Sequence, residues 1–198
     1  MFTTTARNQM LDATDITHLS AHTDYPGTTQ ANEVTGGSPA YARKSITFAS
    51  AASGIKASNN AQVFDIPAGT TVRWFGFSTA STAGTGRAVA PNGAAPKEFN
   101  VDITNNEIEA VAHGYSDGQQ IVFYGGTPPG GLTAGTIYFV RDSAADLFKV
   151  AATAGGSAID LTTVAGSDCV VSVIVEETFG AQGTMTVASG AAPLNLNN

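Results

Sequence analysis

Short apolar runs separated by clusters of turn-forming residues constrain the fold of this chain more than any other feature. Four of these runs, IVFY, TIYFV, LFKVAAT and CVVSVIV, lie within residues 98–177. Gly, Pro, Asp and Ser clusters separate them at the spacing that is typical of a meandering β-barrel or β-sandwich. We therefore predict that residues 98–177 form a small β module that is complete in itself.

Strand patterns also lie outside this module. On its N-terminal side they cover residues 41–48, 62–67 and 70–78, and a short strand is expected near Arg87–Ala90. The compact turn PAGTT, residues 67–71, predicts that the second and third of these strands form a hairpin.

The chain closes with two more strand patterns, GTMTV (183–187) and PLNLN (193–197). Two strands cannot form a core alone, so they must pair with residues 41–78. The predicted domains are a discontinuous outer β domain, residues 1–97 and 178–198, and an inserted small β module, residues 98–177.

A single helix is predicted, at the start of the chain. Thr3–Thr5 offer N-cap hydroxyls, and Ala6, Met10, Leu11 and Ala13 approximate an apolar helical stripe. Such a short helix needs tertiary packing to persist. The expected fold class is mainly β: a β-sandwich-like outer domain with a short N-terminal helix, plus an inserted small β-barrel or sandwich module.

Composition indicates an assembled protein that does not bind nucleic acid. Charged residues make up 13% of the chain, against roughly 25% in ordinary globular domains, which indicates that neighbours in an assembly cover much of the surface. The net charge is −7, and the nine basic residues are scattered. Because phosphates require clustered Lys and Arg, nucleic acid is not an expected partner.

Neither a disulfide nor a membrane segment is expected. The lone cysteine, Cys169, excludes an intramolecular disulfide and lies in an apolar run, where it reads as a buried and inert thiol. The N-terminal residues lack the apolar segment of a signal peptide, and no run approaches the ~18 apolar residues of a membrane span.

One motif resembles a catalytic one. GYSDG (114–118) fits the G-x-S-x-G pattern that would make Ser116 a hydrolase nucleophile. That motif requires a buried strand before the serine, a helix after it, and a histidine later in the chain. Here a strand pattern follows, and all three histidines precede Ser116. We therefore interpret GYSDG as a β-turn.

Other combinations of reactive side chains also fail to make a site. His18, His22 and Asp24 could share a strand face as metal ligands, but a pair of surface histidines is the simpler interpretation. His113 precedes a glycine and is expected in a turn. The carboxylates are spread out, without a pair suited to glycoside hydrolysis. No catalytic, cofactor-binding or metal-binding residue is predicted, no cofactor is expected, and the chain is not expected to be an enzyme.

The loop 125–131 is a candidate surface for contact with a binding partner. GGTPPGG (125–131) has the form of a projecting tip, although such a loop is more often a plain connection between strands. Aromatic residues of the module could extend it into a surface for a receptor or a glycan. The residues of this candidate surface are Tyr115, Tyr124, Pro128, Pro129 and Tyr138.

The outer domain resembles a group of small virion proteins of tailed bacteriophages, of the tail-fibre, minor-tail or head-associated type. The resemblance rests on an early helix like TTARNQMLDA and on four later segments. These are HTDYPGTT (22–29), NEVTGGSPAYARKSITFA (32–49), PAGTTVRWFGFSTA (67–80) and FGAQGTMTV (179–187).

The inserted module is similar to a repeat of phage tail proteins. It carries HGYSDGQQIVFYGG (113–126) and DLFKVAATAGGSAIDLT (146–162). It is also distantly similar to the β half-domain that holds the first catalytic-cysteine region of ubiquitin-activating enzymes. No catalytic residue carries over from either likeness.

These resemblances imply a structural bacteriophage virion protein, assembled in the host cytoplasm. The expected role is a tail or tail-tip component that oligomerises, with a homotrimer favoured, and displays the inserted module. A capsid decoration or head fibre protein is one alternative, and a receptor- or glycan-binding adhesion module is another. The expected partners are other virion proteins and, for the adhesion module, a host surface glycan.

Overall fold

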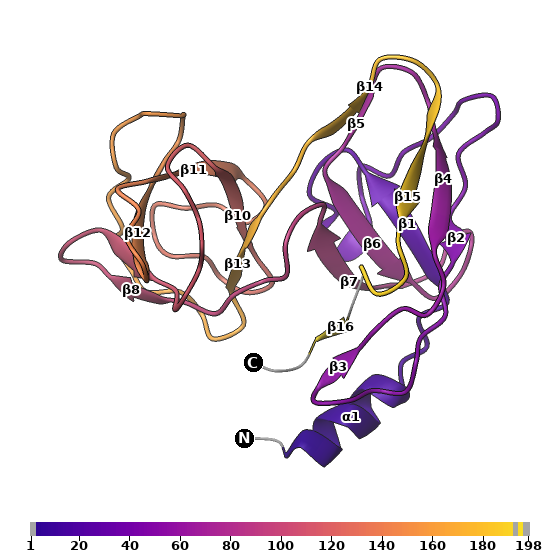
Figure 1. The fold of residues 1–198 in the computed structure, drawn as a ribbon, viewed down its shortest axis with the longest axis horizontal. Coiled ribbons are helices and arrows are strands. Elements are labelled where there is room, and N and C mark those ends of the chain that lie inside the picture. Colours follow the sequence, from indigo (N-terminus) through magenta and orange to yellow (C-terminus); the bar gives the residue numbers. More distant parts are fainter. Residues whose placement is uncertain (1–2, 192–193, 196–198) are drawn as a thin grey trace. The chain divides into compact units, whose positions relative to one another are not determined.

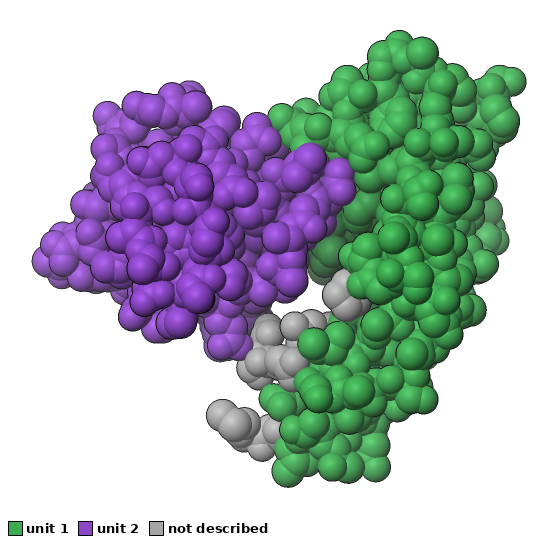
Figure 2. Space-filling view, viewed as in Figure 1, with its two compact units in different colours: residues 1–90, 176–198 green, residues 91–175 purple. Residues whose placement is uncertain are grey.

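The computed structural model describes residues 3–191 and 194–195 of the chain (Figure 1). The chain divides into two compact units, coloured separately in Figure 2. Unit 1 consists of residues 1–90 and 176–198, and unit 2 of residues 91–175. Both are built from antiparallel strands, and the one α-helix of the described residues lies at the start of the chain. The fold is mainly β, with a short N-terminal helix, as predicted.

Unit 1 contains the helix and two groups of strands that the rest of the chain separates. Its elements are α1 (Thr4–Asp12), β1 (His18–His22), the 3-10 turn η1 (Gly27–Thr29), β2 (Lys44–Ser45), β3 (Ile55–Lys56), β4 (Gln62–Ile66), β5 (Thr70–Val72), β6 (Trp74–Ser78), β7 (Gly86–Pro91), β14 (Glu177–Phe179), β15 (Gly183–Val187) and β16 (Leu194–Asn195).

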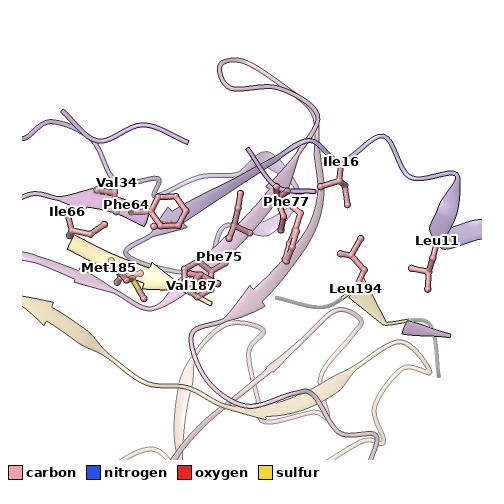
Figure 3. Packing of buried hydrophobic residues seen from close by; sticks show 14 residues of the cluster. Leu11, Ile16, Val34, Phe64, Ile66, Phe75, Phe77, Met185, Val187 and Leu194 are labelled. Atoms are coloured by element: carbon pink, nitrogen blue, oxygen red, sulfur yellow. The ribbon is translucent and has the colours of Figure 1, made fainter. Parts of the chain in front are cut away.

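The core of unit 1 lies between a four-stranded sheet, ordered β2-β1-β6-β7, and the two-stranded ribbon β15-β4. The ribbon alternates strictly: Phe64 is buried and faces Met185, whereas Val63 is exposed beside Thr186. Figure 3 shows Phe64, Met185 and Phe75 gathered in the same interior. This two-layer arrangement is the sandwich that the alternation predicts.

The predicted helix is confirmed, and so is its N-cap. The Thr3 hydroxyl accepts a hydrogen bond from the Ala6 N–H at 3.2 Å. Leu11 is buried in the core of unit 1. Asp12, at the helix end, accepts from the Ala51 N–H at 2.9 Å and forms a 3.1 Å ion pair with Lys56. Tertiary contacts therefore hold this short helix in place.

The predicted hairpin between residues 62–67 and 70–78 is wrong. β4 pairs with β15, and β5 pairs with β14, so both partners come from the closing segment of the chain. β6 instead pairs with β1 along its full length. The turn allows the chain to reverse, but β15 pairs with β4 so that Phe64 and Met185 lie on one shared buried face.

The C-terminal strands do pair with the region 41–78. β15 lies beside β4, and β16 lies beside β3 through Leu194 and Lys56. Within the predicted strand 193–197 only residues 194–195 are described. The strand expected at 41–48 is reduced to β2, and beyond it the Ile46 N–H donates to the Thr17 carbonyl and Phe48 forms an isolated bridge with Ser58.

Unit 2 forms one antiparallel sheet of six strands. The strands are β8 (Asn100–Asp102), β9 (Glu107–Glu109), β10 (Gln120–Tyr124), β11 (Ile137–Arg141), β12 (Leu147–Ala151) and β13 (Val170–Val173), in the spatial order β13-β10-β11-β12-β9-β8. All four predicted apolar runs are strands. Their buried side chains form a separate core that includes Phe123, Val140 and Phe148.

The ends of unit 2 are tied together. The Val175 N–H donates to the Asn92 carbonyl at 2.5 Å, and the Ser172 hydroxyl donates to the Ala94 carbonyl at 2.6 Å. Lys97 and Val171 exchange two backbone hydrogen bonds. Residues 91–97 therefore belong to unit 2, although the sequence pattern assigned them to the outer domain.

No helix in the described part of the chain has both the length and the apolar character needed to cross a membrane.

Candidate partner-binding groove

The three tyrosines of the predicted contact surface are buried, so that prediction is corrected. Tyr115 is 7% exposed, and Tyr124 and Tyr138 are each 6% exposed. Burial raises the pKa of the Tyr115 phenol to about 12. The Tyr138 hydroxyl accepts from the Thr133 N–H at 2.9 Å, inside the unit. These rings belong to the core of unit 2 or its immediate lining and cannot offer an aromatic surface to a ligand.

The loop 125–131 does not project either. Thr162 donates its N–H to the Gly130 carbonyl at 3.0 Å, and Gly166 donates to the Thr127 carbonyl at 2.9 Å. A Cβ at Gly126 would come within 2.7 Å of the Cys169 nitrogen. Pro129 is buried and Pro128 half-buried. The loop therefore lies against the segment 160–169 as a close-packed connection.

The GYSDG segment forms a turn, as interpreted. The Gln119 N–H donates to the Ser116 carbonyl at 3.0 Å, and the turn runs directly into β10. His113 is buried, and its Nδ1 accepts from the Tyr115 N–H at 2.8 Å. The imidazole thus fixes the backbone that precedes Ser116 and does not contact the serine.

His18, His22 and Asp24 make separate contacts. His22 is fully buried, and its Nδ1 donates to the Ala31 carbonyl at 2.7 Å. Burial lowers the pKa of this imidazole. His18 contacts the Thr17 hydroxyl, and Asp24 accepts from the Tyr25 N–H. Over the described residues, no group of three or more His, Cys, Asp or Glu side chains could hold a metal ion.

A buried polar layer covers one face of the four-stranded sheet in unit 1. Arg43 and Glu33 form a bidentate ion pair, in which Nη2 donates to Oε2 at 2.7 Å and Nε donates to Oε1 at 2.8 Å. Arg43 also donates to the Ser78 hydroxyl. Ser20 and His22 lie 2.8 Å apart on the same face. A Cβ at position 76 would come within 2.6 Å of His22 Nε2, which explains the glycine. This layer holds the segment 23–43 onto the sheet and is closed to any substrate.

Cys169 is buried, as predicted. Desolvation raises the pKa of its thiol to about 11, so the thiolate nucleophile is scarce at neutral pH.

A groove of about 830 Å³ on unit 2 was missed by the sequence reasoning. Its lining comes from two places in the chain. Residues 98–101 supply one part together with Glu109 and Val111, and residues 164–167 supply the other together with Cys169. The first part belongs to the edge strand β8 and its neighbour β9, and the second precedes β13, at the opposite edge of the sheet.

The groove exists because the two edges of the sheet separate. Lys97 and Val171 are joined by backbone hydrogen bonds of 2.8 and 3.0 Å. Beyond this bridge, no backbone hydrogen bond joins residues 98–102 to residues 164–169, all of which are described. The outer edge of β8 therefore keeps backbone donors and acceptors that no strand of the described residues uses.

The groove combines apolar and acidic side chains. Val111 is 73% exposed and Val164 is 63% exposed, which is unusual for large β-branched residues. Glu98 and Glu109 also line the groove, and neither forms an ion pair with any described residue. The Glu109 carboxylate accepts only a 3.3 Å hydrogen bond from Asn100.

Comparison with known proteins gives one match. The family model described as podophage GP4 fiber I protein gp80 matches residues 1–111. No curated protein and no solved structure matches the chain. The likeness of residues 98–177 to the half-domain of ubiquitin-activating enzymes therefore stays a prediction.

Proposed function

Because the chain belongs to the family of the podophage GP4 fiber I protein gp80, we propose that this phage fibre-type structural protein is a tail or tail-tip component. In this proposal unit 1 makes the contacts of assembly, and unit 2 is displayed from it. The family match carries the proposal, since it begins at residue 1 and includes every element from α1 to β9.

The strands of unit 1 support an assembly role. Three of its sheets have only two strands each: β14-β5, β15-β4 and β16-β3. A two-stranded ribbon is marginally stable alone, and its edges invite pairing with another chain. Met10, Ile55 and Val63 are large apolar side chains of this unit that are 50%, 38% and 48% exposed. Contacts with neighbouring subunits would cover both features.

A closed homotrimer is the oligomer that we favour, because rotational symmetry lets each ribbon edge meet the next subunit without leaving a free end. The alternative of a capsid decoration protein uses the same contacts and differs in copy number. An adhesion surface built on the module's tyrosines has lost its support, since those rings are buried.

Quantitative mass spectrometry of purified virions tests the proposal, together with gold labelling by an antibody against unit 2. We expect a few copies per particle and label at the tail. Hundreds of copies with label over the capsid would support the decoration alternative. Absence from particles would refute a virion role altogether.

A further inference from the structure

We propose that the groove beside β8 binds an extended, cationic segment of another protein. The segment would add to the edge of β8 as a further strand, with a Lys or Arg placed near Glu98 and Glu109. This inference goes beyond the proposed function and does not rest on it, because unit 2 alone supplies every residue of the groove.

The edge of β8 beside the groove is open to a further strand. Residues 98–102 make no backbone hydrogen bond across the groove, whereas Lys97 just before them is paired with Val171. An added strand would continue the pairing that Lys97 begins. Strand addition of this kind takes its affinity from main-chain hydrogen bonds and its specificity from side-chain pockets.

Two exposed valines give the groove an apolar surface. Val111 and Val164 come from segments far apart in the sequence, and both line the same groove. Phe99 also lines the groove, and its ring packs edge-on against Phe123, with the centroids 5.2 Å apart. A partner with apolar side chains on alternate residues would bury these surfaces while its backbone pairs with β8.

The charge of the groove is complementary to a cationic segment. The two carboxylates Glu98 and Glu109 line the groove without ion-pair partners among the described residues. Lys97 lies just outside the lining and donates its ammonium to the Ala112 carbonyl at 3.0 Å. Unit 2 as a whole has nine carboxylates and three basic residues, a net charge of −6. Its field attracts cationic segments and repels acidic ones.

The basic residues of the chain indicate that the segment bound in the groove comes from a different protein and not from a second copy. All nine basic residues of the chain are described, and seven of them are already in ion pairs. The other two are Lys97, which contacts Ala112, and Arg7, which donates to the Thr4 hydroxyl on α1. The chain therefore has no unpaired cation on a strand to offer to another copy.

A glycan fits the groove less well. Sugar rings are usually held on an exposed aromatic face, and Phe99 is the one aromatic residue in the lining. Its ring is only partly exposed and packs against Phe123.

The test uses the full 198-residue chain, labelled with nitrogen-15, and a blocked pentapeptide of sequence Thr-Val-Lys-Val-Thr. Addition of the peptide at millimolar concentration should shift the backbone amides of residues 98–102 and of Val111 and Val164. Two control peptides carry Glu in place of Lys, or N-methyl groups along one edge of the backbone. Both should bind more weakly.

A matched pair of variants tests the role of charge. Glu98→Gln combined with Glu109→Gln should raise the dissociation constant of the Lys peptide roughly three- to tenfold, as expected for two partly exposed ion pairs. Asp117→Asn combined with Asp160→Asn removes the same charge from unit 2, but outside the groove. This variant should change the dissociation constant of the Lys peptide by about twofold or less. All four positions are exposed, so the variants should fold, and their amide spectra report this directly.

Four results would overturn the proposal. The first is no shift at millimolar peptide, and the second is equal binding of the Glu or N-methylated peptide. The third is a shift of residues 98–102 on dilution without any peptide, because the occupant would then be a second copy. The fourth is a stronger response of the same amides to an oligosaccharide than to the Lys peptide.

Discussion

The two units use their charged residues in opposite ways. Unit 1 has six basic residues and seven carboxylates, and five of its cations are paired with carboxylates of the same unit. Unit 2 has three basic residues and nine carboxylates, and seven of those carboxylates form no ion pair within the described chain. The net charge of −7 therefore resides almost entirely on unit 2.

In unit 1 the charges join segments of the chain, whereas in unit 2 most of the carboxylates are unpaired within the described residues. In unit 1 the ion pairs join distant segments: Arg43 to Glu33, Lys56 to Asp12 and Arg73 to Glu176. These pairs use five of the six cations of unit 1, and the unit as a whole has a net charge of −1. In unit 2 most carboxylates have no ion-pair partner among the described residues, so they give this unit a negative field.

The largest predicted effect tests whether each unit has its own core. Phe64→Ala should lower the free energy of unfolding of unit 1 by about 3–5 kcal/mol, and Phe123→Ala should do the same to unit 2. Hydrogen exchange of backbone amides, followed by NMR, should show lost protection in one unit only. Val63→Ala, at the exposed neighbour of Phe64, is the control and should cost about 0.5 kcal/mol or less. If either Phe variant lost protection in both units, the claim that each unit has its own core would be wrong.

The next effect compares one ion pair from each unit. Arg43→Met leaves the carboxylate of Glu33 largely buried without its cation, and should cost unit 1 about 3 kcal/mol. Arg141→Met removes the more exposed pair with Asp142 in unit 2 and should cost about 1 kcal/mol or less. Urea unfolding of both variants measures the difference. Equal losses of unfolding free energy would mean that ion pairs contribute equally to the stability of the two units.

A smaller effect concerns assembly and rests on the proposed function. Val63→Lys places a charge on the exposed face of the β15-β4 ribbon, where a neighbouring subunit would have to desolvate it. The oligomer should dissociate at least about tenfold more readily, a change of about 1.4 kcal/mol. Sedimentation velocity should show no change for Val164→Lys in unit 2. A reversed outcome would place the subunit interface on unit 2.

The smallest effect is a pH dependence that belongs to unit 1. Burial lowers the pKa of His22 below its ordinary value of 6.5, so the unfolded chain gains a proton before the folded chain does as the pH falls. The contribution of neutral His22 to stability is complete above pH 6.5 and is lost as the pH drops through the lowered pKa. Urea midpoints of unit 1 should therefore decline below pH 6.5.

Two variants identify the group responsible for this decline. His22→Gln should remove it, and His18→Gln, at a half-exposed position on the same strand, should retain it. A decline that survives His22→Gln would assign the pH dependence to another group.

Much of the fold could be predicted because it is encoded in local patterns. The hydroxyls of Thr3–Thr5 predicted the helix cap, and Thr3 supplies it. The four apolar runs of residues 98–177 predicted four of the six strands of unit 2, β10 to β13. Each of these signals lies within a few neighbouring residues.

The pairing of distant strands could not be read in this way. β4 and β5 are neighbours in sequence and were expected to pair, but their partners lie more than 100 residues later. The β8–β9 hairpin was also missed, although Glu107, Ile108 and Glu109 alternate in burial as a half-buried strand does. The alternation of polar and apolar residues in Glu-Ile-Glu was the sequence signal that could have predicted this strand at the edge of the groove.

The groove itself depends on a tertiary arrangement. Val111 and Val164, which are far apart in the sequence, line one groove because the chain pairs Lys97 with Val171 and leaves the segments beyond that bridge unpaired with each other. The burial of Tyr124 and Tyr138, in contrast, could have been predicted from the sequence. Tyr124 ends the run IVFY, which is apolar on both faces, and Tyr138 lies inside TIYFV. Aromatic residues in such runs belong to the interior more often than to a binding surface.

The most direct test of the two-unit account is deletion of unit 2. The backbone bond between Val175 and Asn92 brings the two ends of the unit together, so a short Gly-Ser turn can replace residues 91–175. The account predicts that the shortened chain folds, with the amide shifts of β1, β4 and β15 and the pH dependence due to His22 unchanged. A shortened chain that is unfolded, or that loses the β15-β4 pairing, would contradict it.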